Sequence, residues 1–187
     1  IFVTGRGKTA IEDYFDMAYE LEANLDAKGK HDIIETLGSS RLPAGRAAFV
    51  RQQEPLGLGH AVWCARDLIN DEPFAVLLPD ELLWNPAEPC LKQMVGTYER
   101  MGGNVVSVLE VPVEHVNRYG IVDPGAADGA VTEVRGLVEK PVRDKAPSRL
   151  AVVGRYILQP EVMAILDAKE TGAGGEIQLT DAMARLI

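Results

Sequence analysis

An apolar run that stops abruptly at an acidic turn, from Phe74 to Glu81, constrains the fold more than any other feature of the chain. Its five consecutive apolar residues before Pro79 are typical of a strand buried on both faces, as in a parallel sheet between helices. In an open α/β sheet, ligands bind outside the carboxyl ends of the strands. We therefore expect Asp80 to lie where a cation or a polar ligand would be held. A solvated acidic turn with no chemical role would show the same pattern.

The composition indicates a single globular domain over residues 1–187 and argues against some partners. The chain is 47% hydrophobic and 25% charged, and 187 residues can bury one sizeable core. The formal charge of −9 argues against nucleic acid as a partner, because binding to phosphate backbones needs clustered Lys and Arg. No apolar run has the length of a membrane span and no signal-peptide pattern is present, so we expect no membrane partner and a cytoplasmic location.

The side chains offer no candidate for nucleophilic or zinc chemistry. Cys64 and Cys90 lack metal-ligand spacing and are expected to be reduced thiols. His31, His60 and His115 are far apart, and the chain has no G-x-S-x-G elbow. An enzyme with this sequence would therefore work by positioning and charge.

The middle and the end of the chain predict two kinds of strand pairing. A second apolar strand, Val105 to Val111, follows the first after a helix over Pro89 to Arg100, and this βαβ order favours parallel pairing of the two strands. The later strands are joined by turns and polar loops, which indicates an antiparallel or mixed lobe. We expect these strands at Tyr119–Asp123, Val131–Glu139 and Ala151–Leu158, and helices at Pro160–Lys169 and Ile177–Ile187.

The first part of the chain predicts a strand followed by a long helix. Ile1 to Val3 is typical of a strand, and a capping box from Thr9 to Glu12 predicts a helix over Ala10 to Lys28. Gly7-Lys8-Thr9 matches the end of a phosphate-binding P-loop. The glycine that this motif requires five positions earlier is Phe2, so no P-loop is predicted.

A second strand, Ala47 to Arg51, runs into a loop over Gln52 to His60 that contains Gly57 and Gly59, and a helix follows. Strand, glycine-bearing loop and helix can bring backbone amides close to a ligand, because glycine has no Cβ to hold the ligand away. A tight connection that needs positive φ would explain the same glycines.

The string from Gln52 to Ala61, Q-Q-E-P-L-G-L-G-H-A, resembles the bacterial UTP:glucose-1-phosphate uridylyltransferases of the sugar-nucleotidyltransferase superfamily. Further segments resemble the same family in the same order and together span nearly the whole chain. They are Arg6-Gly7-Lys8 with Ile11-Glu12-Asp13 and Phe15-Asp16, Leu78-Pro79-Asp80, Arg118-Tyr119-Gly120, Val138-Glu139-Lys140-Pro141, Val153-Gly154-Arg155-Tyr156 and Gly175-Glu176-Ile177-Gln178-Leu179-Thr180-Asp181.

The resemblance implies an α/β fold with a Rossmann-like mixed, mainly parallel sheet flanked by helices, and a smaller antiparallel sugar-binding lobe. It implies a Mg²⁺-dependent transfer of UMP from UTP to glucose 1-phosphate, giving UDP-glucose and pyrophosphate. Catalysis of such a reaction is mostly positioning and charge neutralisation. The resemblance also implies a homo-oligomer, either a dimer or a tetramer.

The same resemblance implies roles for individual residues. By similarity, Gln52 and Gly57 bind the nucleotide, Asp80 holds Mg²⁺, Gly120, Glu139 and Gly154 bind the sugar, and Lys140 contacts the sugar phosphate, with Asp80 and Lys140 as the catalytic residues. Alternation along a strand aims Glu139 and Lys140 at opposite faces. Both can serve only where the strand ends before Pro141.

The resemblance further predicts a glycine-rich phosphate loop before Ile1 and a second metal carboxylate after Ile187. We therefore expect these 187 residues alone to have little or no activity. Two alternatives stay open: a related enzyme that uses dTTP, ATP or another sugar 1-phosphate, and a non-catalytic regulator that binds sugar nucleotides. The presence of Gln52, Asp80, Glu139 and Lys140 argues against the regulator, because a sensor could have lost the metal carboxylate without cost.

Overall fold

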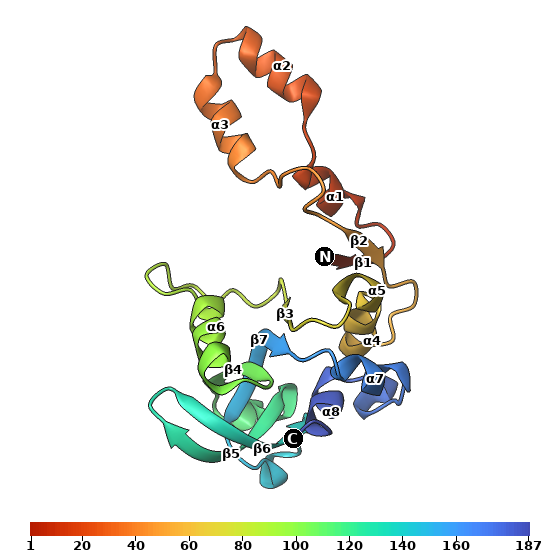
Figure 1. Ribbon diagram of the computed structural model, residues 1–187, viewed down its shortest axis with the longest axis vertical. Coiled ribbons are helices and arrows are strands. Elements are labelled where there is room, and N and C mark those ends of the chain that lie inside the picture. Colours follow the sequence, from red (N-terminus) through yellow and green to blue (C-terminus); the bar gives the residue numbers. More distant parts are fainter. The chain divides into compact units, whose positions relative to one another are not determined.

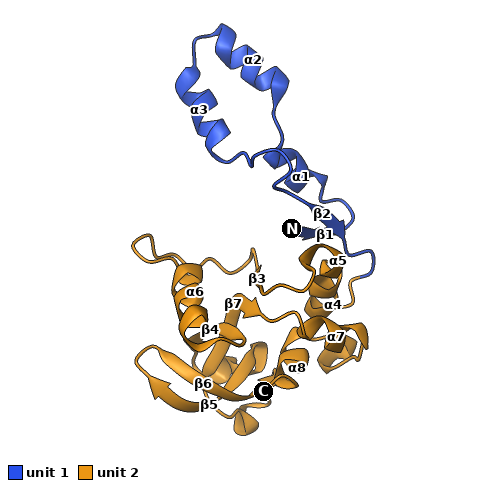
Figure 2. Cartoon of the chain, viewed as in Figure 1, with its two compact units in different colours: residues 1–54 blue, residues 55–187 orange.

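Residues 1–187 are all described by the computed structural model, and their contacts separate them into two units, residues 1–54 and 55–187 (Figure 2). That the chain forms one nucleotidyltransferase domain stays a prediction.

The first unit holds a short parallel pair of strands, with three helices in the chain between them. Strand β1 (Phe2–Thr4) pairs with β2 (Phe49–Arg51), and the Phe2 and Phe49 rings stack with centroids 5.0 Å apart. Both strands are rich in the β-branched and aromatic residues that favour extended backbone. The helices are α1 (Thr9–Phe15), α2 (Tyr19–Ala27) and α3 (His31–Ser39).

The single helix expected over Ala10 to Lys28 is wrong, because the chain leaves the helix at Asp16 and resumes it at Tyr19. The capping box is also absent: Thr9 is already helical, and no side chain caps the helix. The break turns α2 so that the buried carboxylate of Glu22 pairs with Arg41, which follows α3. Apolar spacing continues through the break, so periodicity alone could not show it.

The second unit contains a five-stranded sheet built around β7 (Leu150–Leu158) (Figure 1). Almost all residues of β7 are buried. Strands β3, β4 and β5 each pair antiparallel with β7, and β6 pairs antiparallel with β5. The four surrounding strands are β3 (Phe74–Leu77), β4 (Val105–Glu110), β5 (Gly120–Asp128) and β6 (Val131–Glu139).

The predicted parallel pairing of the strands over 74–78 and 105–111 is wrong. Ile157 of β7 pairs with Ala75 on one side and with Val105 on the other, so β7 lies between β3 and β4. Strand β3 consequently has one partner, and its residues alternate between half-buried and exposed instead of being buried on both faces. The α/β class, with parallel and antiparallel sheets flanked by helices, is confirmed. Parallel pairing itself is confined to β1 and β2.

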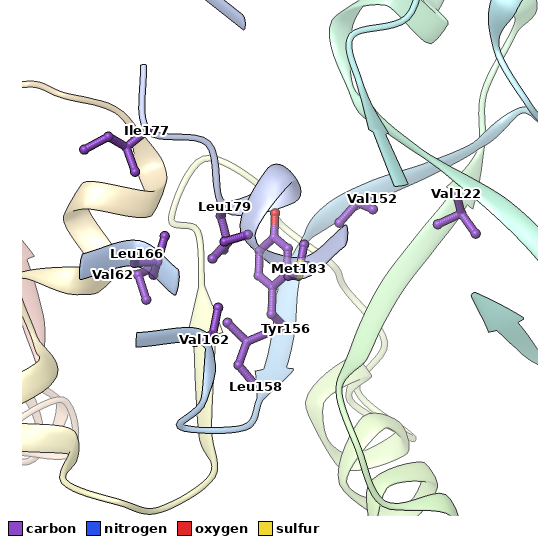
Figure 3. Close-up of a cluster of buried hydrophobic side chains, with 11 residues drawn as sticks. Val62, Val122, Val152, Tyr156, Leu158, Val162, Leu166, Ile177, Leu179 and Met183 are labelled. Carbon is purple, nitrogen blue, oxygen red and sulfur yellow. The ribbon is translucent and has the colours of Figure 1, made fainter. Parts of the chain in front are cut away.

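Helices cover the sheet of the second unit and form its core. The largest apolar cluster joins β7 to α4, α7 and α8, and includes Tyr156, Leu158 and Leu179 (Figure 3). Fully burying a side chain such as Leu158 contributes about 1.5–3 kcal/mol, so this cluster holds β7 in place. Helix α6 packs against β4 and β7. The helices are α4 (Leu58–Trp63), α5 (Arg66–Ile69), α6 (Cys90–Met101), α7 (Val162–Asp167) and α8 (Leu179–Ala184), with 3-10 turns η1 (Val113–Arg118), η2 (Arg143–Lys145) and η3 (Ala173–Gly175).

None of these helices combines the length and hydrophobicity that a membrane crossing requires.

Candidate active site

Asp80 lies in a turn at the carboxyl end of β3, in the position that the sequence predicts. The strand ends at Leu77, and the Leu78 amide donates a hydrogen bond of 2.9 Å to the carbonyl of Gly154 on β7. Pro79 cannot donate a backbone hydrogen bond, so the chain leaves the sheet there. The Asp80 side chain is exposed.

The Arg155 side chain ties this turn to β7. Its Nη1 donates to the carbonyls of Leu78 at 2.8 Å and of Gly154 at 3.0 Å, and its Nη2 donates to the carbonyl of Glu81 at 2.6 Å. The carbonyls of Leu78 and Glu81 stand on either side of Pro79 and Asp80. One guanidinium therefore holds both ends of the turn.

Gly154 lets β7 approach the same turn closely. Its φ is +58°, and a Cβ at this position would lie 2.8 Å from Glu81 Cγ and 3.2 Å from Leu78 Cβ. Any larger residue would combine backbone strain with a steric clash. This packing explains the glycine by itself, so a contact between Gly154 and a sugar stays a prediction.

Gly120, Glu139 and Thr180 converge from β5, β6 and α8. Gly120 and Glu139 are opposite each other in the β5–β6 pair. A Cβ on Gly120 would lie 2.9 Å from Thr180 Oγ1 and 3.2 Å from Glu139 Oε2, so the hydroxyl and the carboxylate approach one point. The Glu139 side chain is only 10% exposed. A carboxylate and a hydroxyl this close together can bind the hydroxyl groups of a polar ligand.

Lys140 brings its ammonium group to the Glu139 carboxylate through an unusual backbone conformation. Strand β6 ends at Glu139, and Lys140 has φ +44°, which costs a non-glycine residue about 1–3 kcal/mol. Its Nζ lies 3.2 Å from Glu139 Oε1, with 47% of the Lys140 side chain exposed. The expectation that both side chains can act together only where the strand ends agrees with this geometry.

The phenol of Tyr156 connects the two halves of this region. Its pKa is raised to about 12, mainly by burial and then by the carboxylates of Glu139, Glu81 and Asp80. These carboxylates come from the end of β6 and from the turn after β3, on either side of β7. The Asp80 turn and Glu139 therefore both act electrostatically on one buried phenol, which stays protonated at neutral pH.

Negative charge dominates this region. Burial and the nearby Glu139 carboxylate raise the pKa of Asp181, whose carboxylate also meets the Cα face of Gly172 closely. An anionic ligand would need a cation besides Lys140. No three His, Cys, Asp or Glu side chains gather to hold a metal ion, so a cation beside Asp80 would have at most two such side chains as ligands. Mg²⁺ fits such a site, because it is usually bound by one or two carboxylates together with substrate phosphates and water.

Gly57 and Gly59 pack against the backbone that leads into α8. A Cβ on Gly57, where φ is +104°, would lie 2.8 Å from Ile177 O, and one on Gly59 would lie 2.7 Å from the same atom. The Gly59 amide donates to Ile177 O and the Ile177 amide donates to Leu56 O, both at 2.8 Å. These contacts are those of a tight connection, and nucleotide binding by Gly57 stays a prediction.

Replacing Gly59 by Ala should lower the free energy of unfolding by about 1–3 kcal/mol, because the added methyl group has no space beside Ile177 O and Leu166. Urea denaturation measures this change. The control is Gly96→Ala in α6, where a Cβ meets nothing within 4 Å. This variant should raise the free energy of unfolding by about 0.5–1 kcal/mol. Equal stability of the Gly59 variant and wild type would contradict the packing argument.

Gln52 belongs to the first unit and directly follows β2. Its amide donates to the carbonyl of Thr4 at 2.9 Å, which continues the pairing with β1, and its side chain is half-buried. Its reading of a nucleotide base stays a prediction.

Three residues around this site have no role in the sequence-based assignment: Arg155, Tyr156 and Thr180. Each lies in a segment that carries the family resemblance, but only the packing shows what it touches. One local signal could have pointed to Arg155, which is the sole charged residue in the apolar strand β7.

The fold is that of a nucleotidyl transferase. The model of the nucleotidyl transferase family matches residues 28–187, and the chain belongs to this family. Its relatives include curated UTP–glucose-1-phosphate uridylyltransferases, as the motifs indicate. The one from Bacillus subtilis (strain 168) is 48% identical over 186 residues, which are 100% of this chain and 63% of the relative. The chain thus spans less than two thirds of that protein.

Solved structures agree with this assignment. UDP-glucose pyrophosphorylase complexed with UDP-glucose is similar with a TM-score of 0.83 and 39% identity, over 98% of this chain and 66% of the other. UTP-bound UGPase from Acinetobacter baumannii is similar with a TM-score of 0.85 and 38% identity, over 98% of this chain and 65% of the other.

Proposed function

We propose that the protein transfers UMP from UTP to glucose 1-phosphate, giving UDP-glucose and pyrophosphate. The observation that carries this proposal is the geometry at the end of β6, where the Lys140 ammonium lies 3.2 Å from the Glu139 carboxylate, together with the Asp80 turn at the end of β3. It supplies a carboxylate for a cation, a carboxylate for hydroxyl groups and an ammonium for a phosphate. The names of the relatives support the choice of the two substrates.

The chain's own residues would act by positioning and by neutralising charge. The sugar phosphate attacks the α-phosphorus of UTP in line and pyrophosphate leaves, without a covalent enzyme intermediate. Glu139 accepts hydrogen bonds from sugar hydroxyls, while the half-exposed ammonium of Lys140 pairs with the sugar phosphate. A divalent cation, with Mg²⁺ the best match, would neutralise UTP phosphates beside Asp80.

The remaining assigned residues complete the proposal. Gln52 would read the uracil edge, because a side-chain amide offers both a donor and an acceptor. Gly57 would let the backbone meet the base, and the backbone at Gly120 and Gly154 would face the sugar. A homo-oligomer and a cytoplasmic location stay predictions.

The proposal is tested by turnover of the full-length protein with glucose 1-phosphate and UTP, dTTP or ATP, with Mg²⁺ or with EDTA. We expect UDP-glucose and pyrophosphate to form fastest from UTP and the reaction to stop in EDTA. Faster turnover of dTTP or ATP would assign another nucleotide. Binding of UDP-glucose without turnover would indicate a regulator.

Glu139→Gln should raise the KM for glucose 1-phosphate by roughly 10- to 100-fold, since hydrogen bonds to a charged group contribute about 1.5–3 kcal/mol. The KM for UTP should change little. Steady-state kinetics with each substrate varied in turn measure both effects. Glu133→Gln, in the exposed part of the same strand, is the control. A change in the KM for UTP alone would remove Glu139 from the sugar site.

A further inference from the structure

Arg155 is the only charged residue of β7. Its half-buried guanidinium forms no ion pair with a carboxylate. It donates instead to the three carbonyls of Leu78, Gly154 and Glu81. Because all three acceptors are backbone carbonyls, the Arg155 side chain fixes the position of the backbone around it.

The backbone that Arg155 holds is the turn that carries Asp80. The Nη1 and Nη2 atoms reach carbonyls on the two sides of Pro79 and Asp80, at 2.8 Å and 2.6 Å. The guanidinium is rigid and planar, so these two bonds fix the separation and direction of the two carbonyls together. Gly154 allows the turn to pack closely against β7, since its missing side chain leaves room for Glu81.

We infer that Arg155 is a positioning residue that sets the orientation of the Asp80 carboxylate for binding the divalent cation. This inference rests on the proposed function, because it assigns Arg155 to the same cation site. Arg155 acts through the turn and does not contact the substrates. Its loss should affect cation binding more than sugar binding.

The test compares full-length wild type with Arg155→Lys, which keeps the charge but replaces the planar fork by one nitrogen. We expect the Mg²⁺ concentration for half-maximal turnover to rise by about 10-fold, in the range that residues supporting metal ligands usually show. Mn²⁺ binding in the presence of UTP, followed by electron paramagnetic resonance, should weaken similarly. The KM for glucose 1-phosphate should change less than the Mg²⁺ dependence, because Glu139 and Lys140 lie at the end of β6 and are not among the groups to which Arg155 donates.

Arg135→Lys is the matched control, because Arg135 is an exposed arginine of β6 that pairs with Glu133 and is remote in the sequence from the Asp80 turn. It should leave all three measurements at wild-type values. If Arg155→Lys does not fold, Arg155→Gln replaces it, because a neutral amide keeps one donor without burying a charge.

A lower thermal midpoint with unchanged Mg²⁺ and Mn²⁺ dependence would overturn the inference and leave Arg155 as a purely structural residue. An equal loss in the KM for glucose 1-phosphate would overturn it too. Absence of Mg²⁺-dependent uridylyl transfer in the wild type would overturn the proposed function instead, so the two failures are distinguishable.

Discussion

Asp80→Asn in the full-length protein should lower the turnover rate for UDP-glucose synthesis by at least about 100-fold, comparable to removing one preorganised charge-stabilising group. The substitution preserves the shape of the side chain but removes the negative charge that a hard cation requires of its ligand. Without the cation, repulsion between the triphosphate and the sugar phosphate is uncompensated. Steady-state rates over a range of Mg²⁺ concentrations measure the effect.

The fold should tolerate this change, because the Asp80 side chain is exposed and the turn is held by backbone carbonyls. We expect little change in the thermal midpoint and partial recovery of the rate at high Mg²⁺. Asp71→Asn, at the other end of β3, is the control and should behave as wild type. Unfolding of Asp80→Asn with an unaltered Mg²⁺ dependence in the remaining active protein would make Asp80 an ordinary turn residue.

Lys140→Met should lower kcat/KM for glucose 1-phosphate by about 100- to 1,000-fold, because the ammonium that would meet the sugar phosphate is lost. The loss should not depend on which sugar carries the phosphate. It also leaves the nearly buried Glu139 carboxylate without its partner at 3.2 Å. Kinetics with several sugar 1-phosphates measure the effect, and Lys145→Met in the exposed turn η2 is the control.

Lys140→Gly separates the chemical role of Lys140 from its effect on the fold. Glycine relieves the cost of φ +44°, which is about 1–3 kcal/mol for other residues, and this gain roughly offsets its larger entropy in the unfolded chain. The variant should therefore be as inactive as Lys140→Met while its thermal midpoint stays near that of wild type. Retained activity in either variant would remove Lys140 from the catalytic residues.

Short-range patterns predicted the elements of the second unit well. The apolar run before Pro79 marks β3 and places Asp80 after its end. The glycines at 102 and 103, both with positive φ, end α6 where expected. The three later strands form an antiparallel arrangement, as their short polar connections indicate. Such features depend on residues close together in the chain, so the sequence contains enough information to locate them.

Several features of the candidate site could not be predicted in this way. Glu139 and Lys140 were assigned by resemblance, but the positive φ of Lys140 that brings their side chains together has no local signal. The glycines at 57 and 154 were associated with ligands. Their packing against Ile177 and Glu81 involves partners about 120 and 70 residues away, as estimated from chain separation.

Residue identity and spacing were thus sufficient for the α/β class, the family and the acidic turn after β3. The tertiary structure decided strand order, since β7 follows β3 and β4 in the chain but lies between them in the sheet. It also decided which groups meet: the guanidinium of Arg155 and the carbonyls of the Asp80 turn, and the ammonium of Lys140 and the carboxylate of Glu139. The physical reason is that periodicity specifies which face of an element is buried, whereas its neighbour is chosen by packing and hydrogen bonding across the whole core.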